Sequence, residues 1–279
     1  MANKANNDEV VTWRNGKKLN EENRLDHLLF KKKSLENKKT KIELLIEKLG
    51  IEKYAKELDE EGYTVVPPSV TGVSEEMVDE LIKGLLEKSE ELIPGTKFSL
   101  DMKGNDVLDY GKFEGFIERM SGAKPAQFQL VQLCTYKSRA FRDLAINPVA
   151  TALIQHMVGY GEARFSSHNA FVKWRGEGYG DSLGLHVDQG AVPYPWGEQA
   201  YNANCNWVLT DYTKDAGPLA VVPKSHLLRK HPTFPDAIEQ AIPVLCPKGS
   251  LVIFHGATWH GAYPRKDEGL RLVSQILFP

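Results

Sequence analysis

The apolar residues in the first part of the chain are spaced as in amphipathic helices. Within residues 40–56, and again over 77–86, they recur at intervals of three and four positions, which places them on one helical face. Ser74, followed by two glutamates, is a typical cap for the second of these helices. A third helix is predicted over 139–158. Residues 63–66 form a short apolar run that two prolines end, as expected of a strand.

Beyond residue 160 the pattern changes from helical to extended. Short apolar runs alternate with clusters rich in glycine and proline, and they cover residues 163–174, 205–210, 219–222, 250–255 and 270–278. Such spacing favours an antiparallel sandwich or barrel over alternating β-α-β units. We therefore predict a mostly β fold with flanking helices, in which the β-core carries the chemistry.

Composition narrows the classes of function. The 279 residues carry a net charge of −2, and the basic run at 31–33 has no aromatic or glycine interleaving, so we expect neither a nucleic acid nor an anionic membrane as partner. Three widely spaced cysteines without a C-x-x-C pair argue against a disulfide framework and against structural zinc. No apolar run approaches the length of a secretory signal or a membrane span, so we expect a cytoplasmic protein.

A candidate metal site lies in the second half of the chain. His186 and Asp188 are two positions apart, so on an extended backbone both side chains point to the same side and can bind one ion. His260, which follows a predicted strand and has glycine nearby on both sides, is the candidate third ligand, and His255 competes with it. Two imidazoles and one carboxylate leave three positions open, as iron(II) requires to bind a cosubstrate and O₂ together. The other histidines are expected in the core (His168, His226) or on the surface (His27, His156, His231).

Arg271 is a candidate anion-binding residue. It lies eleven positions beyond His260 in a predicted strand, where it opposes its apolar neighbours Leu270 and Leu272. A guanidinium that points into a barrel needs a carboxylate partner, and a dicarboxylate cosubstrate could pair with it through two hydrogen bonds. The alternative is an arginine that faces outward from the strand.

The order of these motifs resembles the phytanoyl-CoA dioxygenase (PhyH-like) family. The matching features are H-x-D, then A-G-P-L-A-V-V-P-K-S-H at 216–226, then F-H-G-A-T-W-H-G-A at 254–262, and then Arg271. The resemblance extends from about residue 58 to 278. It implies a double-stranded β-helix (jelly-roll, cupin-like) core in an enzyme that uses Fe(II), 2-oxoglutarate and O₂. On this basis we expect a polar, helical extension over 1–50 and a dioxygenase domain over 51–279.

The resemblance also implies roles for individual residues. His186, Asp188 and His260 would be the iron ligands, and Arg271 would bind the distal carboxylate of 2-oxoglutarate. Trp207, Asn169 and Lys173 are further candidates for contacts with this cosubstrate. Ser225 and His226 are expected to be structural.

Two positions depart from the pattern of the family. Leu183 and Leu185 stand where family members often carry a polar residue such as glutamine, and Ala262 stands where many carry serine or threonine. Asp188, in contrast, is retained, and related halogenases replace this carboxylate with a small residue. Its presence favours hydroxylation or another oxidation.

We therefore predict an oxygenase that hydroxylates, or otherwise oxidises, an unactivated C–H bond of a small metabolite or natural product, with release of succinate and CO₂. Substrate selection is expected in two places: the segment 190–204, as an aromatic lid or alternatively an ordinary packed loop, and the helical half at 102–120 and 127–136. The rival interpretations are a cupin-like isomerase or hydrolase that does not use 2-oxoglutarate, and a non-catalytic binding protein. The oligomeric state is left open.

Overall fold

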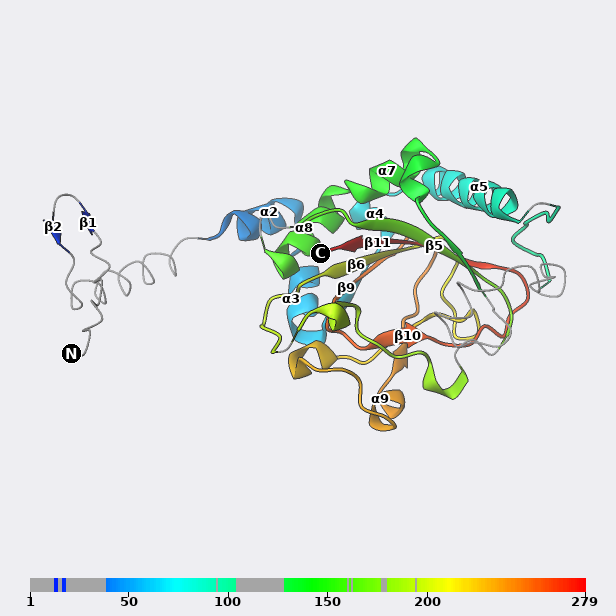
Figure 1. Cartoon of the computed structure of the whole chain (residues 1–279). Helices are drawn as coiled ribbons and strands as arrows, with labels where there is room; N and C mark the ends of the chain where they lie inside the picture. Colours follow the sequence, from blue (N-terminus) through cyan, green and yellow to red (C-terminus); the bar gives the residue numbers. More distant parts are fainter. Residues whose placement is uncertain are drawn as a thin grey trace, which may run out of the picture. The chain divides into compact units, whose positions relative to one another are not determined.

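The computed structural model describes residues 39–93, 95–103, 128–159, 161, 163–176, 180–193 and 195–279, together with the backbone at 13–14 and 17–18. The chain forms two units, Met1–Leu44 and Leu45–Pro279. In the first unit, β1 (Trp13–Arg14) and β2 (Lys17–Lys18) pair as antiparallel strands (Figure 1). Most of the predicted N-terminal arm lies outside the described residues, and a domain boundary at residue 50 stays a prediction. Within the ranges above, no helix combines the length and apolar character needed to cross a bilayer.

The predicted helices are present, but the segments 40–56 and 139–158 are each divided into two helices. The segment 139–158 splits because Asn147 caps a new helix by accepting from the amides of Val149 and Ala150, while Pro148 has no amide hydrogen with which to continue the preceding helix. The Ser74 hydroxyl accepts from the Met77 amide, as predicted. The helices are α2 (Lys41–Leu49), α3 (Glu52–Glu61), α4 (Pro68–Thr71), α5 (Glu75–Leu92), α7 (Arg139–Ala145), α8 (Pro148–Val158) and α9 (Asp236–Glu239), with short 3₁₀ turns at Cys134–Tyr136, Gly180–Ser182, Asp188–Ala191 and Ser225–Leu228.

Two antiparallel sheets form the centre of the second unit. The larger has the order β3-β9-β6-β11-β5-β4, and the smaller has the order β10-β7-β8. All five strands predicted beyond residue 160 are present within a few residues. The strands are β3 (Tyr63–Val66), β4 (Phe128–Val131), β5 (Ser167–Lys173), β6 (Ala203–Val208), β7 (Leu219–Val221), β8 (Ile242–Pro243), β9 (Leu251–His255), β10 (His260–Ala262) and β11 (Arg271–Phe278).

One expectation for the helical half is wrong. Residues 128–131, which we had assigned to it, form the edge strand β4, because they pair with β5 in antiparallel register and Gln129 is buried there. Residues 104–127, which include most of the other proposed substrate segment, lie outside the described residues.

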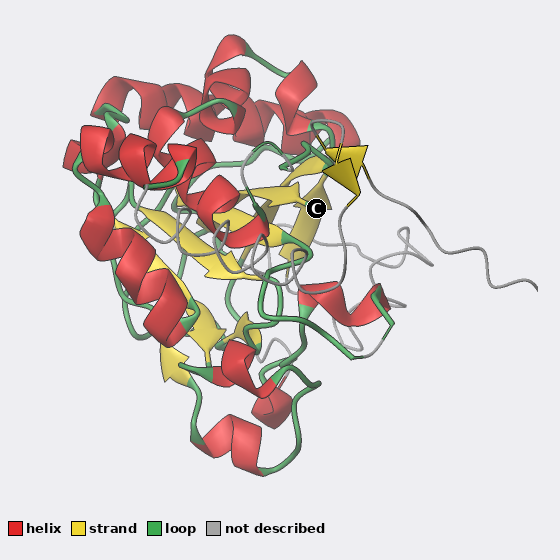
Figure 2. Cartoon of the chain, turned by 90° about the vertical axis from the view of Figure 1, so that its left-hand side faces the viewer, coloured by secondary structure: helices red, strands yellow, loops and turns green. Residues whose placement is uncertain are grey.

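The larger sheet has a helix-covered face and an inner face. Figure 2 shows helices gathered on one side of the strands. On that side, His168 of β5 contacts the ring edge of Phe141 in α7 and hydrogen-bonds the Ser274 hydroxyl of β11. On the other side, Val208 and Val273 pack in one cluster with residues of the smaller sheet. Among the described residues the strands do not close into a barrel, so the inner faces of the two sheets form an open sandwich.

Candidate functional site

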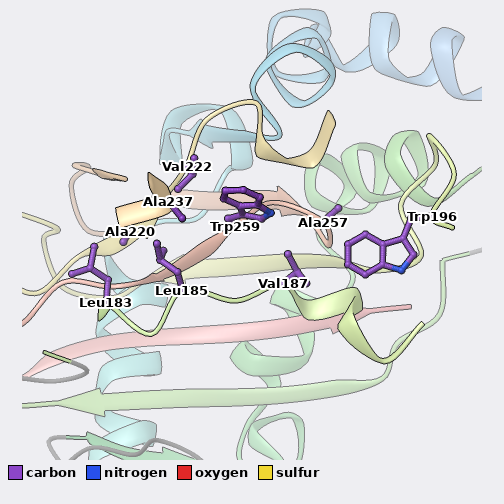
Figure 3. Packing of buried hydrophobic residues seen from close by; sticks show 9 residues of the cluster. All are labelled: Leu183, Leu185, Val187, Trp196, Ala220, Val222, Ala237, Ala257 and Trp259. Atoms are coloured by element: carbon purple, nitrogen blue, oxygen red, sulfur yellow. The ribbon is translucent and has the colours of Figure 1, made fainter. Parts of the chain in front are cut away.

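Alternation along residues 183–188 sets the direction of the two H-x-D side chains. Leu183, Leu185 and Val187 are buried in an apolar cluster with Trp259 and neighbours from the smaller sheet (Figure 3). Because side chains alternate on an extended backbone, His186 and the residues two positions away point to the opposite side. The burial of Leu185 and Val187 on one side of the chain thus fixes the orientation of His186 and Asp188 on the other.

The structure brings His186, Asp188 and His260 together. The backbones of His186 and His260 exchange two hydrogen bonds, of 2.9 and 3.0 Å between N and O, so the segment 183–188 lies directly beside β10. Nε2 of His186 lies 3.5 Å from one carboxylate oxygen of Asp188, and Nε2 of His260 lies 3.4 Å from the other. One ligand atom from each residue falls within 4.8 Å of the others, so the three could hold a metal ion.

The hydrogen bonds of the two rings leave lone pairs facing the carboxylate. Nδ1 of His186 lies 2.7 Å from the Gly184 carbonyl oxygen, and Nδ1 of His260 lies 3.0 Å from that of Thr258. A carbonyl oxygen only accepts, so each Nδ1 carries the hydrogen and each Nε2 of a neutral ring presents a lone pair. Burial lowers the pKa of His260 to about 4, so this ring is neutral at pH 7. Burial lowers the pKa of His186, but Asp188 and the Gly184 carbonyl outweigh this effect and raise it overall, so a cation that binds there would replace a proton on this ring. With that proton displaced, two nitrogen lone pairs and a carboxylate converge as a donor set for a cation.

Asp188 is held by its backbone and by its side chain. Its amide and that of Gln189 donate to the Gly256 carbonyl oxygen, at 3.0 and 3.1 Å. The Asn204 amide donates to its carboxylate. Burial raises the pKa of Asp188, but His260 and His186 outweigh this effect and lower it overall, so the group is an anion at neutral pH.

The glycines of the 254–262 motif allow close backbone approach. A side chain on Gly256 would overlap Asn202, and one on Gly261 would overlap the Leu183 carbonyl. Gly261 therefore lets the two segments that carry His186 and His260 lie against each other without a Cβ between them, and Gly256 allows the same approach to the start of β6.

His255, the alternative third ligand, is not part of this group. Its Nδ1 accepts from the Ala257 amide, and its ring lies 5.4 Å from that of His226. It is separated from the triad because it follows Phe254 on β9, and adjacent strand residues face opposite sides of the sheet. Phe254 is the residue that contacts His260, with ring centroids 4.5 Å apart.

The register of the strands shows which of the remaining candidates for cosubstrate contacts lie on the inner face of the larger sheet. Lys173 lies opposite Arg271, and Asn169 lies opposite Gln275, on the inner face of β5 and β11. Trp207 lies opposite Ser274, whose hydroxyl bonds His168 on the helix-covered face. The structure therefore does not bring Trp207 together with the triad, because adjacent residues of β6 point to opposite sides.

Sequence reasoning missed several polar residues of the inner face. Asn204 and Asn206 project from β6 on the side of Asp188, and Gln275 lies opposite Asn206 on β11. The side-chain oxygens of Asn204 and Asn206 are buried and have no partner among the described residues. The alternation of polar residues in A-N-C-N-W-V was the available signal for this pair.

Two buried basic residues lie opposite each other at the other end of the inner face. Arg271 donates through Nη1 to the Tyr212 hydroxyl at 3.0 Å, and its Nε has no partner among the described residues. The Nζ of Lys173 donates a hydrogen bond to the carbonyl oxygen of Tyr263, at 2.5 Å. Burial, Arg271 and Arg265 all lower the pKa of Lys173 well below its ordinary value. No acidic side chain of the described residues pairs with Arg271 or Lys173, which fits a seat for an anion.

The expected lid segment is packed on the protein. Trp196 is buried and donates from Nε1 to the Val192 carbonyl, and Gln199 donates to the Val158 carbonyl at the end of α8. Tyr201 is partly exposed, and Tyr194 lies outside the described residues. The described part of this segment resembles the packed loop that was the alternative.

The fold and the donor set together fit a metal-binding protein of the jelly-roll class. The family model for phytanoyl-CoA dioxygenase (PhyH) matches residues 58–273, and the chain therefore belongs to this family. This confirms the resemblance to this family that the order of the motifs predicted.

Curated relatives match only a short stretch. Uncharacterized proteins of Mycobacterium bovis and Mycobacterium tuberculosis are each 34% identical over 61 residues, which is 22% of this chain and 22% of theirs. The match thus spans about a fifth of the length of these relatives.

Solved structures share the fold across most of the chain. The 2-oxoglutarate-dependent carbocyclase SnoK from nogalamycin biosynthesis is 18% identical with a TM-score of 0.55, covering 81% of this chain and 82% of that one. The epimerase SnoN from the same biosynthesis is 20% identical with a TM-score of 0.55, covering 82% of each chain. HygX from Streptomyces hygroscopicus, with nickel and 2-oxoglutarate bound, is 15% identical with a TM-score of 0.55, covering 81% and 85%. These similarities confirm the predicted fold class, a jelly-roll core with flanking helices.

Proposed function

We propose that His186, Asp188 and His260 hold iron(II) and that the enzyme oxidises a C–H bond of a small organic molecule. The observation that carries this proposal is the convergence of two imidazole Nε2 lone pairs on a buried carboxylate, with distances of 3.4 and 3.5 Å. Two nitrogens and one carboxylate oxygen on one side of an ion are the donor set of non-haem iron oxygenases. Iron(II) bound there would supply activation of O₂, and 2-oxoglutarate would supply the remaining two electrons.

The residues of the chain have distinct tasks in this scheme. The carbonyls of Gly184 and Thr258 fix the tautomer of the two imidazoles, and Asn204 orients the carboxylate of Asp188. Rigid placement of this kind costs no reorganisation during turnover. Because Asp188 is present, no halide position is opened at the site, and the chemistry that we propose is oxidation.

Arg271 is the proposed anchor for the distal carboxylate of 2-oxoglutarate. Its guanidinium is buried, has an unpartnered Nε among the described residues, and faces the inside of the sandwich. Asn169 and Lys173 line the same inner face on β5 and are proposed to contribute further contacts. Trp207 is not included, because β6 directs it to the other face.

A small natural product or metabolite is the proposed substrate, and hydroxylation is the proposed reaction. SnoN has been solved with 2-oxoglutarate and nogalamycin RO, and HygX with 2-oxoglutarate and hygromycin B. The overall reaction would convert C–H, O₂ and 2-oxoglutarate into C–OH, succinate and CO₂. A cytoplasmic location, and the absence of nucleic-acid and membrane partners, stay predictions from the sequence.

Formation of succinate from 2-oxoglutarate tests this proposal. The purified protein, supplied with Fe(II), ascorbate and air, is expected to release succinate, and a panel of small natural products is expected to contain one that accelerates the release. Asp188→Ala should abolish succinate formation while the protein stays folded, and Asp79→Ala, at an aspartate of α5 whose side chain is 70% exposed, should leave it unchanged. Retained turnover in Asp188→Ala would contradict the proposed ligand set. A product formed without consumption of 2-oxoglutarate would favour the cupin-like alternative.

A further inference from the structure

Lys173 is a buried lysine without a counterion among the described residues. It is 2% exposed, and its Nζ donates to a backbone carbonyl, that of Tyr263. A buried amine that meets only a neutral acceptor is poorly stabilised in its charged form. Methionine or leucine would fill a similar volume but could not donate to the Tyr263 carbonyl, and a neutral amine is sufficient for that hydrogen bond.

The position of Lys173 relates it to both ends of the site. It lies directly opposite Arg271 in the register of β5 and β11, so both side chains share the inner face. Its hydrogen-bond partner, Tyr263, follows Ala262 and lies three positions beyond His260. Arg271 therefore has the Lys173 amine opposite it and the Tyr212 hydroxyl within hydrogen-bond distance as polar neighbours.

We propose that Lys173 is the second cation of the cosubstrate seat: it binds the distal carboxylate of 2-oxoglutarate together with Arg271, and it takes up a proton from solvent as that carboxylate arrives. This proposal rests on the proposed function. The step is a simple protonation, in which the neutral amine of the empty seat becomes an ammonium that faces an anion. No covalent bond forms or breaks.

The charged groups around Lys173 favour this coupling. On β11 the facing group is Arg271, and from the segment after β10 it is Arg265, and both disfavour a third positive charge. The register partner on β4 is Phe128, which does not titrate. Burial acts in the same direction, so the pKa of Lys173 lies well below its ordinary value before the anion binds. A carboxylate within hydrogen-bond reach would reverse that balance.

The seat should therefore select ligands by their distal charge. One arginine beside a hydroxyl can bind one carboxylate. Two adjacent positive charges, in contrast, are compensated only when an anion occupies the seat. 2-Oxoglutarate has a distal carboxylate, and 2-oxovalerate, of the same chain length, does not. We expect discrimination between these two 2-oxo acids to depend on Lys173.

Calorimetry on the protein loaded with Mn²⁺ in place of iron tests the proposal without turnover. 2-Oxoglutarate is titrated at pH 7.5 in two buffers of different ionisation enthalpy, and the difference in heat gives the protons taken up per ligand. The wild-type protein is expected to take up protons as 2-oxoglutarate binds. Lys173→Met should take up none and should bind roughly 10-fold to 100-fold more weakly, the range expected for loss of a charged hydrogen bond. Lys97→Met, at a lysine whose side chain is 91% exposed, is the matched control and should behave as wild type.

The possible outcomes separate this proposal from the function on which it rests. Binding of 2-oxoglutarate without proton uptake would overturn the role of Lys173 and leave the oxygenase assignment intact. Uptake that persists in Lys173→Met would also overturn it, because another group would be the acceptor. Failure of 2-oxoglutarate to bind the metal-loaded wild type would overturn both. If Lys173→Met does not fold, the proton count of the wild type still decides.

Discussion

Replacing Gly261 with alanine tests how the two metal-binding segments are held together. A Cβ at this position would lie 3.1 Å from the carbonyl carbons of Leu183 and Gly184, and the Leu183 oxygen would be closer still. Ordinary contacts of a Cβ lie at 3.4–4 Å, so the segment 183–186 must move away from β10 by roughly 1 Å to relieve the contact with the Leu183 oxygen. The two backbone hydrogen bonds between His186 and His260 span this contact, so the movement displaces one imidazole from the other.

The expected effect is on metal affinity. Overpacking of this kind costs about 1–3 kcal/mol, and metal–ligand distances tolerate only about 0.2 Å. If most of this free energy is lost when the metal ion binds, the affinity for Mn²⁺ falls roughly 5-fold to 150-fold. Alanine also restricts the unfolded chain and offsets part of the cost, by about 0.4–1 kcal/mol.

Calorimetric titration of Mn²⁺ into the apoprotein measures this change, and a thermal melt reports stability in parallel. Gly197→Ala is the control, because a Cβ there meets only the Tyr201 hydroxyl, at 3.9 Å. Unchanged Mn²⁺ affinity in Gly261→Ala would refute the view that this close contact sets the distance between His186 and His260.

Two further predictions concern the polar groups around the site and in the core. Asn204→Ala removes the amide that orients the Asp188 carboxylate and should weaken Mn²⁺ binding about 10-fold to 100-fold, measured by the same titration; equal affinity would show that Asn204 is dispensable. Burial lowers the pKa of His168 and of His255 to about 4, below the ordinary 6.5, so the unfolded chain binds protons first as the pH falls. The free energy of unfolding should therefore fall between pH 6.5 and pH 4, by at most about 1.4 kcal/mol per pH unit for each histidine. Urea unfolding of His168→Gln over this range should show a shallower pH dependence, and an identical slope would contradict the assignment.

The sequence predicted those features that depend on local alternation. The direction of His186 and Asp188 follows from the apolar residues between and beside them, and the inward direction of Arg271 follows in the same way. Both conclusions need only a strand period of two. The family match over residues 58–273 supports the order of the motifs on which they were based.

Other features depend on contacts between distant segments, and they were missed or misplaced. All six residues of β6 are buried, so burial does not distinguish its two faces. Trp207, which points to the helix-covered face, was therefore proposed as a contact of the cosubstrate, and Asn206 was missed. Asn147 and Pro148 indicate that the segment 139–158 is divided, but the prediction of one helix followed the apolar periodicity instead. The neutral partner of Lys173 comes from a residue 90 positions later in the chain, which no local pattern could predict.

The central claim is that His186, Asp188 and His260 bind one iron ion in an enzyme that uses 2-oxoglutarate. A crystal structure of the protein soaked with Fe(II) and 2-oxoglutarate under anaerobic conditions tests it most directly. The account predicts one ion bound by Nε2 of both histidines and a carboxylate oxygen of Asp188, with the distal carboxylate of 2-oxoglutarate at Arg271. An ion bound elsewhere, or 2-oxoglutarate bound away from Arg271, would contradict it.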